Sequence, residues 1–234
     1  MKVQTFAMLF DHSIVRPNVT RSELIQAAET ALRLHTATLT VQPHYIRLGA
    51  DMLRGSGVLL GSVAGFPHGS ETPEMKAFQT KVALDLGAQE IDMVMNIPAL
   101  KNGEHEVFVR DIQGVVQAAQ GCKVKVILEN CFLTDEEKRR ACQWVVEGGA
   151  DFVKTATAYA EGGATLEDVR LMYEAVEGKC LVKASGGVRT IQQVLAFLQA
   201  GARRFGSTRS AEFVQAYQAL SDEERQPFAE FIQE

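Results

Sequence analysis

Short apolar stretches alternate along the whole chain with longer stretches in which apolar residues recur every three or four positions. Segments 58–63 and 124–128 are rich in valine, leucine and isoleucine, which is typical of buried strands. Segment 20–35 instead carries its apolar residues on one helical face, and Thr20 with Glu23 forms a capping-box pattern at its start. The chain therefore predicts eight strands, each followed by a helix.

The expected strands are residues 9–13, 37–41, 58–63, 91–95, 124–128, 152–154, 180–183 and 204–205. The expected helices are residues 20–35, a segment starting at Pro43, then 73–86, 104–119, 134–147, 165–176, 190–199, 210–220 and a last one capped by Ser221 and Glu224.

Eight strand–helix units require a parallel sheet, and their number favours a closed barrel over an open doubly wound sheet. Three segments share one register, in which Gly-Ala ends a helix and a strand follows: 87–92, 149–154 and 201–206. Because alternate strands of a barrel fill the same layers, we expect Asp92, Lys154 and Gly206 to point into one interior layer. The sequence predicts the α/β class with a single-domain (β/α)8 TIM barrel over residues 1–234, with a short N-terminal extension and a C-terminal helix.

Composition narrows the function. The 234 residues are 46% hydrophobic, and the formal net charge of −5 gives no general attraction for nucleic acid or an anionic membrane. No apolar run approaches the ~18 residues of a membrane span, and the start of the chain has no signal-peptide pattern. Four cysteines without zinc spacing predict buried thiols in a reducing compartment: Cys122, Cys131, Cys142 and Cys180. We expect a cytoplasmic protein that binds neither nucleic acid nor membranes.

Two of the predicted strands end in a lysine. Lys154 closes one, and Lys183 occupies the same place 29 residues later, each followed by small or hydroxyl residues. Burying an ammonium group is costly, and two neighbouring lysines lower each other's pKa, which makes an amine nucleophilic near neutral pH. The alternative is a pair of salt-bridged or snorkelling lysines at strand ends.

Two-residue alternation places Lys125 inside the barrel as well, together with Asp92. A lysine with a lowered pKa can form an imine with a carbonyl compound and use it as an electron sink for breaking or making a C–C bond. Asp92 is the candidate proton shuttle, and it can equally serve as the acidic partner of Lys125 or Lys183. The five histidines are scattered without metal-ligand spacing, so we expect neither a metal nor a cofactor.

Small residues follow the last two strands. Segment 185–189 contains Gly186, Gly187 and Arg189, and the other loop contains Gly206, Ser207 and Thr208. Glycine lets backbone N–H groups approach phosphate oxygens, and these two loops often bind phosphate in barrels. The sequence predicts an anion site here, although Gly186-Gly187 alone could form a tight turn.

Several ordered motifs together resemble the 2-deoxyribose-5-phosphate aldolases, which are class I aldolases on a (β/α)8 barrel. The resemblance runs from 11–13 to 206–207 and is carried by Gly65-Phe66-Pro67-His68-Gly69, Glu90-Ile91-Asp92, Lys125 to Glu129, Phe152-Val153-Lys154-Thr155 and Val182 to Gly187. It implies Lys154 as the Schiff-base lysine, Lys183 as the cation that tunes it and Asp92 as the proton relay. It also implies Lys125 as a polar support in the substrate-binding set, and Gly186, Gly187 and Ser207 as the phosphate pocket.

Some positions depart from the pattern of this family. Thr155-Ala156-Thr157-Ala158-Tyr159 stands where Thr-Ser-Thr-Gly is usual, and Ala158 lacks the backbone freedom of glycine. Arg16 stands where lysine is frequent, and a C-terminal tyrosine of some members has no counterpart. The resemblance implies cleavage of 2-deoxyribose 5-phosphate to acetaldehyde and glyceraldehyde 3-phosphate, and we expect a homodimer or a homotetramer. The alternatives are imine chemistry on a different or unphosphorylated sugar or aldehyde, a sugar-phosphate-binding barrel without turnover, and a metal-dependent aldolase or isomerase.

Overall fold

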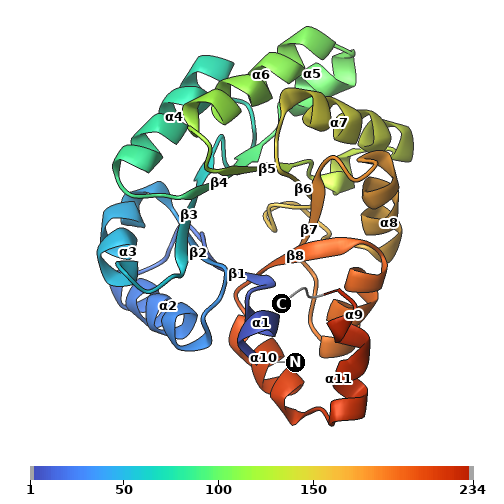
Figure 1. The fold of residues 1–234 in the computed structure, drawn as a ribbon. Helices are drawn as coiled ribbons and strands as arrows, with labels where there is room; N and C mark the ends of the chain where they lie inside the picture. The colour runs from blue at the N-terminus through green and yellow to red at the C-terminus, as the bar shows by residue number, and fades with distance from the viewer. Residues whose placement is uncertain (1–2, 232–234) are drawn as a thin grey trace.

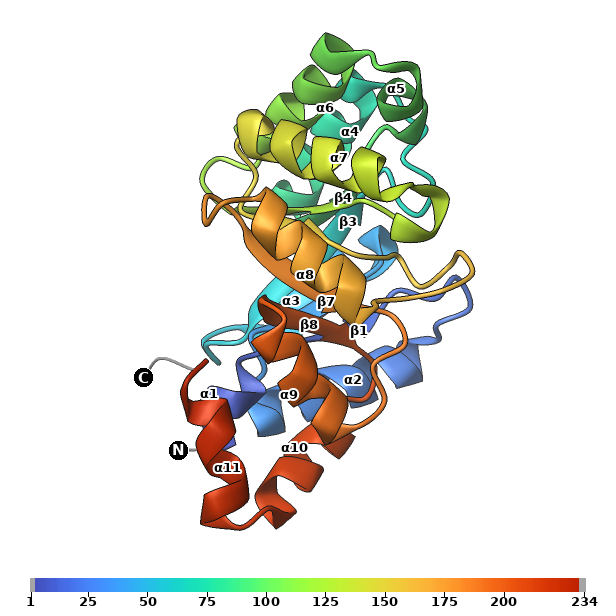
Figure 2. The same cartoon turned by 90° about the vertical axis from the view of Figure 1, so that its right-hand side faces the viewer.

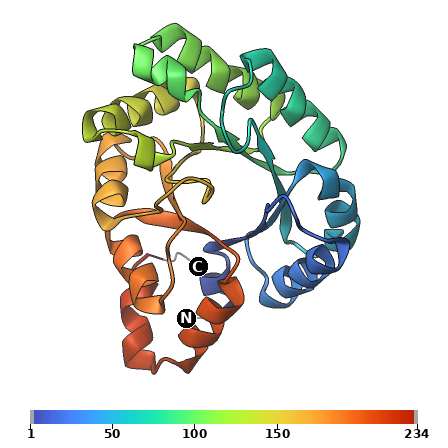
Figure 3. The ribbon, with the colours of Figure 1, turned by 180° about the vertical axis from the view of Figure 1, so that it is seen from behind.

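The computed structural model describes residues 3–231, and the eight strands in this part of the chain close into one barrel (Figure 1). Each strand is parallel to the next, and the last strand pairs with the first through Asp11 and Gly206. The helices lie outside the ring and cover its outer face (Figure 3). The predicted single-domain (β/α)8 barrel is confirmed.

The strands are β1 Phe10–Ile14, β2 Thr38–Val41, β3 Leu59–Ala64, β4 Glu90–Val94, β5 Lys123–Ile127, β6 Phe152–Lys154, β7 Leu181–Ser185 and β8 Ala202–Ser207. The helices are α1 Val3–Ala7, α2 Arg21–Leu34, α3 Ile46–Leu53, α4 Pro73–Asp85, α5 Ile97–Asn102, α6 His105–Ala118, α7 Asp135–Gly148, α8 Leu166–Ala175, α9 Ile191–Gln199, α10 Ser210–Ala219 and α11 Asp222–Ala229, with 3-10 turns at Pro43–Tyr45 and Asn130–Phe132.

Local sequence fixes where helices begin and end. Thr20 starts α2 and Thr134 starts α7, each within a complete capping box closed by a glutamate three residues later. Gly149 ends α7 in the left-handed conformation at φ 82°, which glycine adopts without steric cost. The chain then enters β6 after two residues, which places Lys154 at the carboxyl end of that strand.

Some predicted boundaries were wrong. β1 starts one residue later than expected, and β8 spans Ala202–Ser207 instead of two residues. Two adjacent arginines hid β8, but Arg204 is held inside the barrel by Asp11 at 2.7 Å. The helix expected from Pro43 begins as a single 3-10 turn before α3, and the short helix α5 was not predicted.

The loops after β1 and β6 project side by side at one end of the barrel, and α1 and α11 lie towards the other end (Figure 2). Phe6 of α1 stacks on Tyr217 of α10 at 4.1 Å and meets Phe228 of α11 edge-on at 5.7 Å. One aromatic cluster therefore joins the first and last helices, at the end of the barrel opposite the carboxyl ends of the strands. Between residues 3 and 231, no helix has the length and apolar character needed to cross a membrane.

The cysteines occupy more varied environments than the sequence suggested. All four are free thiols, and Cys142 and Cys180 are buried as predicted. Burial raises the pKa of Cys180 to about 12, which leaves it a poor nucleophile at neutral pH. Cys122 is partly buried and Cys131 is exposed on the 3-10 turn after β5, so the expectation of burial was wrong for these two.

Candidate active site

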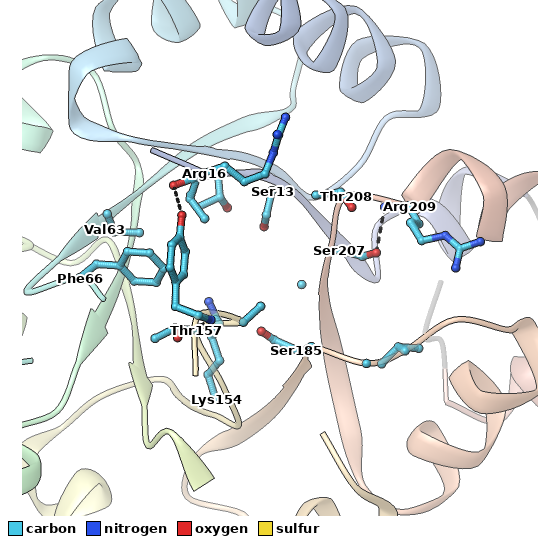
Figure 4. Close-up of a pocket in the computed structure, with 18 of the residues that line it drawn as sticks. Ser13, Arg16, Val63, Phe66, Lys154, Thr157, Ser185, Ser207, Thr208 and Arg209 are labelled. Atoms are coloured by element: carbon cyan, nitrogen blue, oxygen red, sulfur yellow. Dashed lines mark hydrogen bonds between the residues drawn. The ribbon is translucent and has the colours of Figure 1, made fainter. Parts of the chain in front are cut away.

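A cavity of about 480 Å³ opens at the carboxyl ends of the strands, and loops after β1, β6, β7 and β8 line it. Lys154 points into this cavity, with Ser185 and Ser207 on one side and Phe66 on the other (Figure 4). We call it the lysine cavity. The loop after β6 reaches in over the ring of strands (Figure 3).

Lys154 combines burial with access to this cavity. Its side chain is 8% exposed, and Nζ donates to Asp92 Oδ2 at 2.7 Å. Burial lowers the pKa of Lys154 to about 8; Asp92 opposes this shift, and the positive charge of Lys183 adds to it. The neighbouring lysine, which was the expected cause of the low pKa, contributes less to it than removal of Lys154 from water.

Asp92 links the two lysines at the ends of β6 and β7. Lys183, which is opposite Lys154 in the strand register, donates to the same Oδ2 atom at 2.7 Å and also to Asp11. Burial alone would raise the pKa of Asp92, but Lys125, Lys154 and Lys183 together hold it well below its usual range. Asp92 is thus a carboxylate in contact with all three lysines. It pairs with Lys125 and Lys183, as expected for an acidic partner, and it also contacts Lys154.

Lys125 lies deeper in the barrel than Lys154. On β5, Ile127 is opposite Lys154, which places Lys125 two residues closer to the amino end. Its Nζ lies 2.6 Å from Glu90, 2.9 Å from Asp92 and 3.3 Å from Asp11, and the side chain is fully buried. Lys125 is not among the residues that line the lysine cavity, and its contacts are those of a residue that supports Asp92 and Asp11 from behind.

Three further members of the buried cluster were not predicted from the sequence: Asp11, Glu90 and Arg204. Asp11 pairs with Lys183 and Arg204, and Glu90 pairs with Lys125. Glu90 precedes Asp92 by two residues and therefore faces the same interior, so strand alternation alone could have found it. Asp11 lies on a strand of mixed polarity, and only its partners from the far end of the chain show why it is buried.

Charge balance distinguishes Lys154 from its neighbours. In the described part of the barrel, four cationic side chains meet three carboxyl groups: Lys125, Lys154, Lys183 and Arg204 against Asp11, Glu90 and Asp92. With every carboxyl ionised, one positive charge remains unbalanced, and such a buried charge is costly. Loss of a proton from Lys154 removes this excess, and the lowered pKa of Lys154 is the direction that this argument requires.

The two glycine-containing loops meet on the side of Ser185 and Ser207. Gly186 and Gly187 have φ of 82° and 77°, a region that side chains with a Cβ rarely occupy. A Cβ on Gly186 would lie 3.1 Å from the Gly163 Cα, and one on Gly206 would lie 3.2 Å from Lys183 Cε. The predicted residues Gly186, Gly187, Arg189, Gly206, Ser207 and Thr208 all line the lysine cavity. Gly206 also leaves room for the lysine behind it.

The loop after Lys154 is fixed by polar contacts. Thr157 donates its backbone N–H to both carboxylate oxygens of Glu129 at 3.2 Å, and its hydroxyl also donates to Glu129. Ala158 then adopts φ 69°, the left-handed conformation that the usual glycine would enter without strain. The Tyr159 hydroxyl donates to the Val15 carbonyl at 2.9 Å and so ties this loop to the one after β1. These loop residues, together with Ser13 and Phe66, were absent from the predicted site.

Between residues 3 and 231, no three His, Cys, Asp or Glu side chains form a group suited to holding a metal ion. The chemistry that the cavity residues themselves can supply is that of a buried amine beside a carboxylate, at the mouth of a parallel barrel. A barrel with this arrangement defines the class of lysine-dependent aldolases.

Comparisons with known proteins agree with this class. The sequence profile of the DeoC/LacD family aldolases matches residues 5–209, and the chain belongs to this family. It is 46% identical to the deoxyribose-phosphate aldolase of Staphylococcus saprophyticus over 217 residues, covering 93% of this chain and 99% of the relative. The deoxyribose-phosphate aldolase of Streptococcus sanguinis is 44% identical over 212 residues, covering 91% and 96% of the two chains.

Among solved structures, the tetrameric deoxyribose phosphate aldolase of Aeropyrum pernix superimposes with a TM-score of 0.85 at 27% identity, covering 94% of each chain. The protein is therefore an aldolase, a carbon–carbon lyase of the DeoC type.

Proposed function

We propose that this aldolase cleaves 2-deoxy-D-ribose 5-phosphate reversibly to acetaldehyde and D-glyceraldehyde 3-phosphate, with Lys154 as the Schiff-base residue. The observation that carries the assignment of Lys154 is its position: it reaches the lysine cavity, whereas Lys125 and Lys183 lie behind it. Its lowered pKa gives a useful fraction of free amine near neutral pH. The names of the two curated relatives described above support the substrate.

In the cleavage direction, the free amine of Lys154 adds to the C1 aldehyde of the open-chain sugar, and loss of water gives a protonated imine. The C3 hydroxyl then gives up its proton, the C2–C3 bond breaks, and its electron pair moves towards the imine nitrogen. This releases glyceraldehyde 3-phosphate and leaves an enamine on Lys154. Protonation of C2 and addition of water then release acetaldehyde and return the amine.

Asp92 is the proposed proton relay of these steps. Its Oδ2 atom lies 2.7 Å from Lys154 Nζ, and the three lysines hold its pKa well below the usual range, so Asp92 is a carboxylate that a proton would occupy only transiently during the relay. A water molecule in the lysine cavity would carry protons between Asp92 and the sugar, since Asp92 itself is fully buried. Lys183 is proposed to hold Asp92 in place and to disfavour the charged form of Lys154.

The 5-phosphate is proposed to bind against Gly186, Gly187, Ser207 and Thr208, with Arg189 at the rim. Ser207 and Thr208 precede α10, whose first-turn N–H groups add favourable dipole, and Gly186 and Gly187 leave backbone close to the cavity. Lys154 and these loops lie at different places on the cavity wall (Figure 4), as a sugar phosphate held at both ends requires.

The test compares the cleavage of 2-deoxyribose 5-phosphate with that of 2-deoxyribose, measuring acetaldehyde release. We expect turnover of both, with a higher kcat/KM for the phosphorylated sugar. Equal values would favour an aldolase for an unphosphorylated compound, and binding without turnover would favour a sugar-phosphate-binding barrel.

We propose a cytoplasmic location and a homodimer or homotetramer. Free, high-pKa thiols at Cys142 and Cys180 support a reducing compartment. The tetrameric Aeropyrum pernix relative supports self-association. Light scattering of the purified protein will measure the second part of this proposal directly.

A further inference from the structure

A second cavity lies directly beside the lysine cavity. It measures about 400 Å³, and its wall is mostly hydrocarbon, including Pro43, Ile46, Phe78, Val82 and Leu86. We call it the apolar cavity. Both cavities are lined by Val15, Pro17, Val63, Phe66 and Tyr159, so these residues form the partition between them.

The two largest side chains of this partition are those of Phe66 and Tyr159. Phe66 and Tyr159 meet edge to face, with ring centroids 5.4 Å apart and planes at 90°. Phe66 belongs to the loop after β3, and Tyr159 to the loop after β6. The ring of Tyr159 thus spans from its own loop towards the opposite side of the barrel mouth.

Tyr159 is held in this position at both ends. Its hydroxyl donates to the Val15 carbonyl at 2.9 Å, and its backbone N–H donates to Thr157 Oγ1 at 3.0 Å. Thr157 is in turn bound by Glu129. Tyr159 as a residue is nevertheless 43% exposed, so its ring can be replaced without opening a hole in a closely packed core.

Two glutamines of the apolar cavity each have one side-chain atom engaged in a hydrogen bond with the backbone. The side-chain carbonyl of Gln79 accepts the Gly65 N–H at 2.7 Å, and the side-chain amide of Gln42 donates to the Arg16 carbonyl. Most of the wall is hydrocarbon and carries no charged side chain, which favours an aliphatic or aromatic substituent over a sugar or a phosphate. The proposed phosphate loops lie on the other side of Lys154 from Phe66 (Figure 4).

We propose that Tyr159 is a specificity-determining residue: with Phe66 it closes the apolar cavity off from Lys154 and keeps aldehydes with hydrocarbon substituents out. Removing the Tyr159 ring joins the two cavities and creates a subsite for such aldehydes. This inference rests on the proposed imine chemistry at Lys154. It concerns the acceptor aldehyde in the synthesis direction, with acetaldehyde as donor.

The experiment measures kcat/KM for two acceptors, hexanal and glyceraldehyde 3-phosphate, with acetaldehyde as donor. In Tyr159→Ala we expect the hexanal to glyceraldehyde 3-phosphate ratio to rise at least roughly tenfold, the effect of burying about two methylene groups. Tyr159→Phe keeps the ring and loses only the hydroxyl, so its ratio should stay within about threefold of the unmodified enzyme. An unchanged ratio in Tyr159→Ala, or equal increases in both variants, would overturn the proposal.

A second substitution locates the gain. Val82 lines the apolar cavity from α4, is 38% exposed and lies outside the lysine cavity. Adding Val82→Asp to Tyr159→Ala places a charge in the new subsite and should remove the hexanal gain while leaving activity on glyceraldehyde 3-phosphate unchanged. A gain that survives Val82→Asp would show that hexanal binds elsewhere and would contradict the proposal.

Trapping with borohydride and acetaldehyde separates this inference from the function on which it rests. It reports imine formation and needs no acceptor aldehyde. Failure to trap the unmodified enzyme would overturn the proposed imine mechanism. Normal trapping of Tyr159→Ala, combined with an unchanged acceptor ratio, would overturn the partition alone.

Discussion

Lys154 and Lys183 donate to the same oxygen of Asp92: both Nζ atoms lie 2.7 Å from Oδ2. One carboxylate oxygen is therefore shared between a lysine that reaches the lysine cavity and one that is fully buried. Two ammonium groups this close repel each other, and loss of a proton from Lys154 relieves that repulsion. The relationship explains how one of three chemically identical side chains becomes the amine available to a substrate.

The pH dependence of activity follows from the pKa of Lys154. Below about pH 8 this side chain is mostly protonated and cannot attack a carbonyl; above it the free amine predominates. We expect kcat/KM for 2-deoxyribose 5-phosphate to rise with pH and to level off above an apparent pKa of about 8. Steady-state rates between pH 6 and 10 measure this curve. A rate that is flat from pH 6 upwards would show that Lys154 titrates elsewhere.

Lys183→Leu should move that curve to higher pH. The substitution removes a neighbouring positive charge and leaves the negative charges of Asp92 and Asp11 less compensated, and both effects raise the pKa of Lys154. Activity near pH 7 should fall by roughly tenfold or more if the pKa rises by about one unit. Lys183→Arg is the matched control, because it retains the charge and should retain the curve. Identical profiles for the leucine and arginine variants would argue against an electrostatic role.

His12 makes stability depend on pH below neutrality. It is buried, its Nδ1 lies 2.7 Å from Ser210 Oγ, and burial lowers its pKa to about 4. Between its unfolded pKa near 6.5 and about 4, the unfolded state binds more protons than the folded state. The protein therefore loses stability as pH falls through this range, by up to roughly 3 kcal/mol in unfolding free energy.

Denaturant unfolding at pH 7 and pH 5 tests this expectation. His12→Gln keeps an amide that can reach Ser210 and carries no titrating group, so its unfolding free energy should fall less between the two pH values. An equal loss in the variant and the unmodified protein would assign the effect to other groups.

Ala158→Gly should improve recognition of phosphate. Ala158 sits at φ 69°, where a Cβ costs about 1–2 kcal/mol and glycine does not. The unfolded chain gains entropy from glycine, which offsets part of the gain in stability, so the melting temperature should change little. If the loop helps bind phosphate, kcat/KM should rise more for 2-deoxyribose 5-phosphate than for 2-deoxyribose, by up to roughly tenfold.

Ala160→Gly serves as the control for Ala158→Gly, because it loosens the same loop at a residue without positive φ. Equal effects of Ala158→Gly on both sugars would show that this loop does not contact the phosphate.

The barrel could be predicted from the sequence because apolar residues recur with a different spacing in strands and in helices, and the strand–helix alternation repeats eight times. The sequence also predicted that Lys154 and Asp92 meet inside the barrel, since both stand at strand positions where an apolar residue is normal. It was insufficient for Asp11 and Arg204, which are 193 residues apart and become partners only when β1 and β8 close the ring. How far Lys125 lies below the mouth of the barrel depends on the register between β5 and β6. That register is set by the pairing of the two strands, and the pattern within one strand does not reveal it.

Tyr159 escaped prediction for a related reason. Its partners, Val15 and Phe66, come from loops after two other strands, and loop contacts leave no periodic pattern in the sequence. The departure from the family pattern at Ala158 and Tyr159 marked the position but not these contacts. The left-handed conformation of that residue now explains why glycine is the expected residue there.

The central claim, that Lys154 forms the imine, is tested most directly by reducing the enzyme with borohydride in the presence of acetaldehyde and mapping the modified peptide. We predict one ethyl group on Lys154, its loss in Lys154→Leu, and its retention in Lys179→Leu, which removes an exposed lysine that does not line the lysine cavity. An adduct on Lys183 or Lys125 in the unmodified enzyme, or undiminished labelling of Lys154→Leu, would contradict the account.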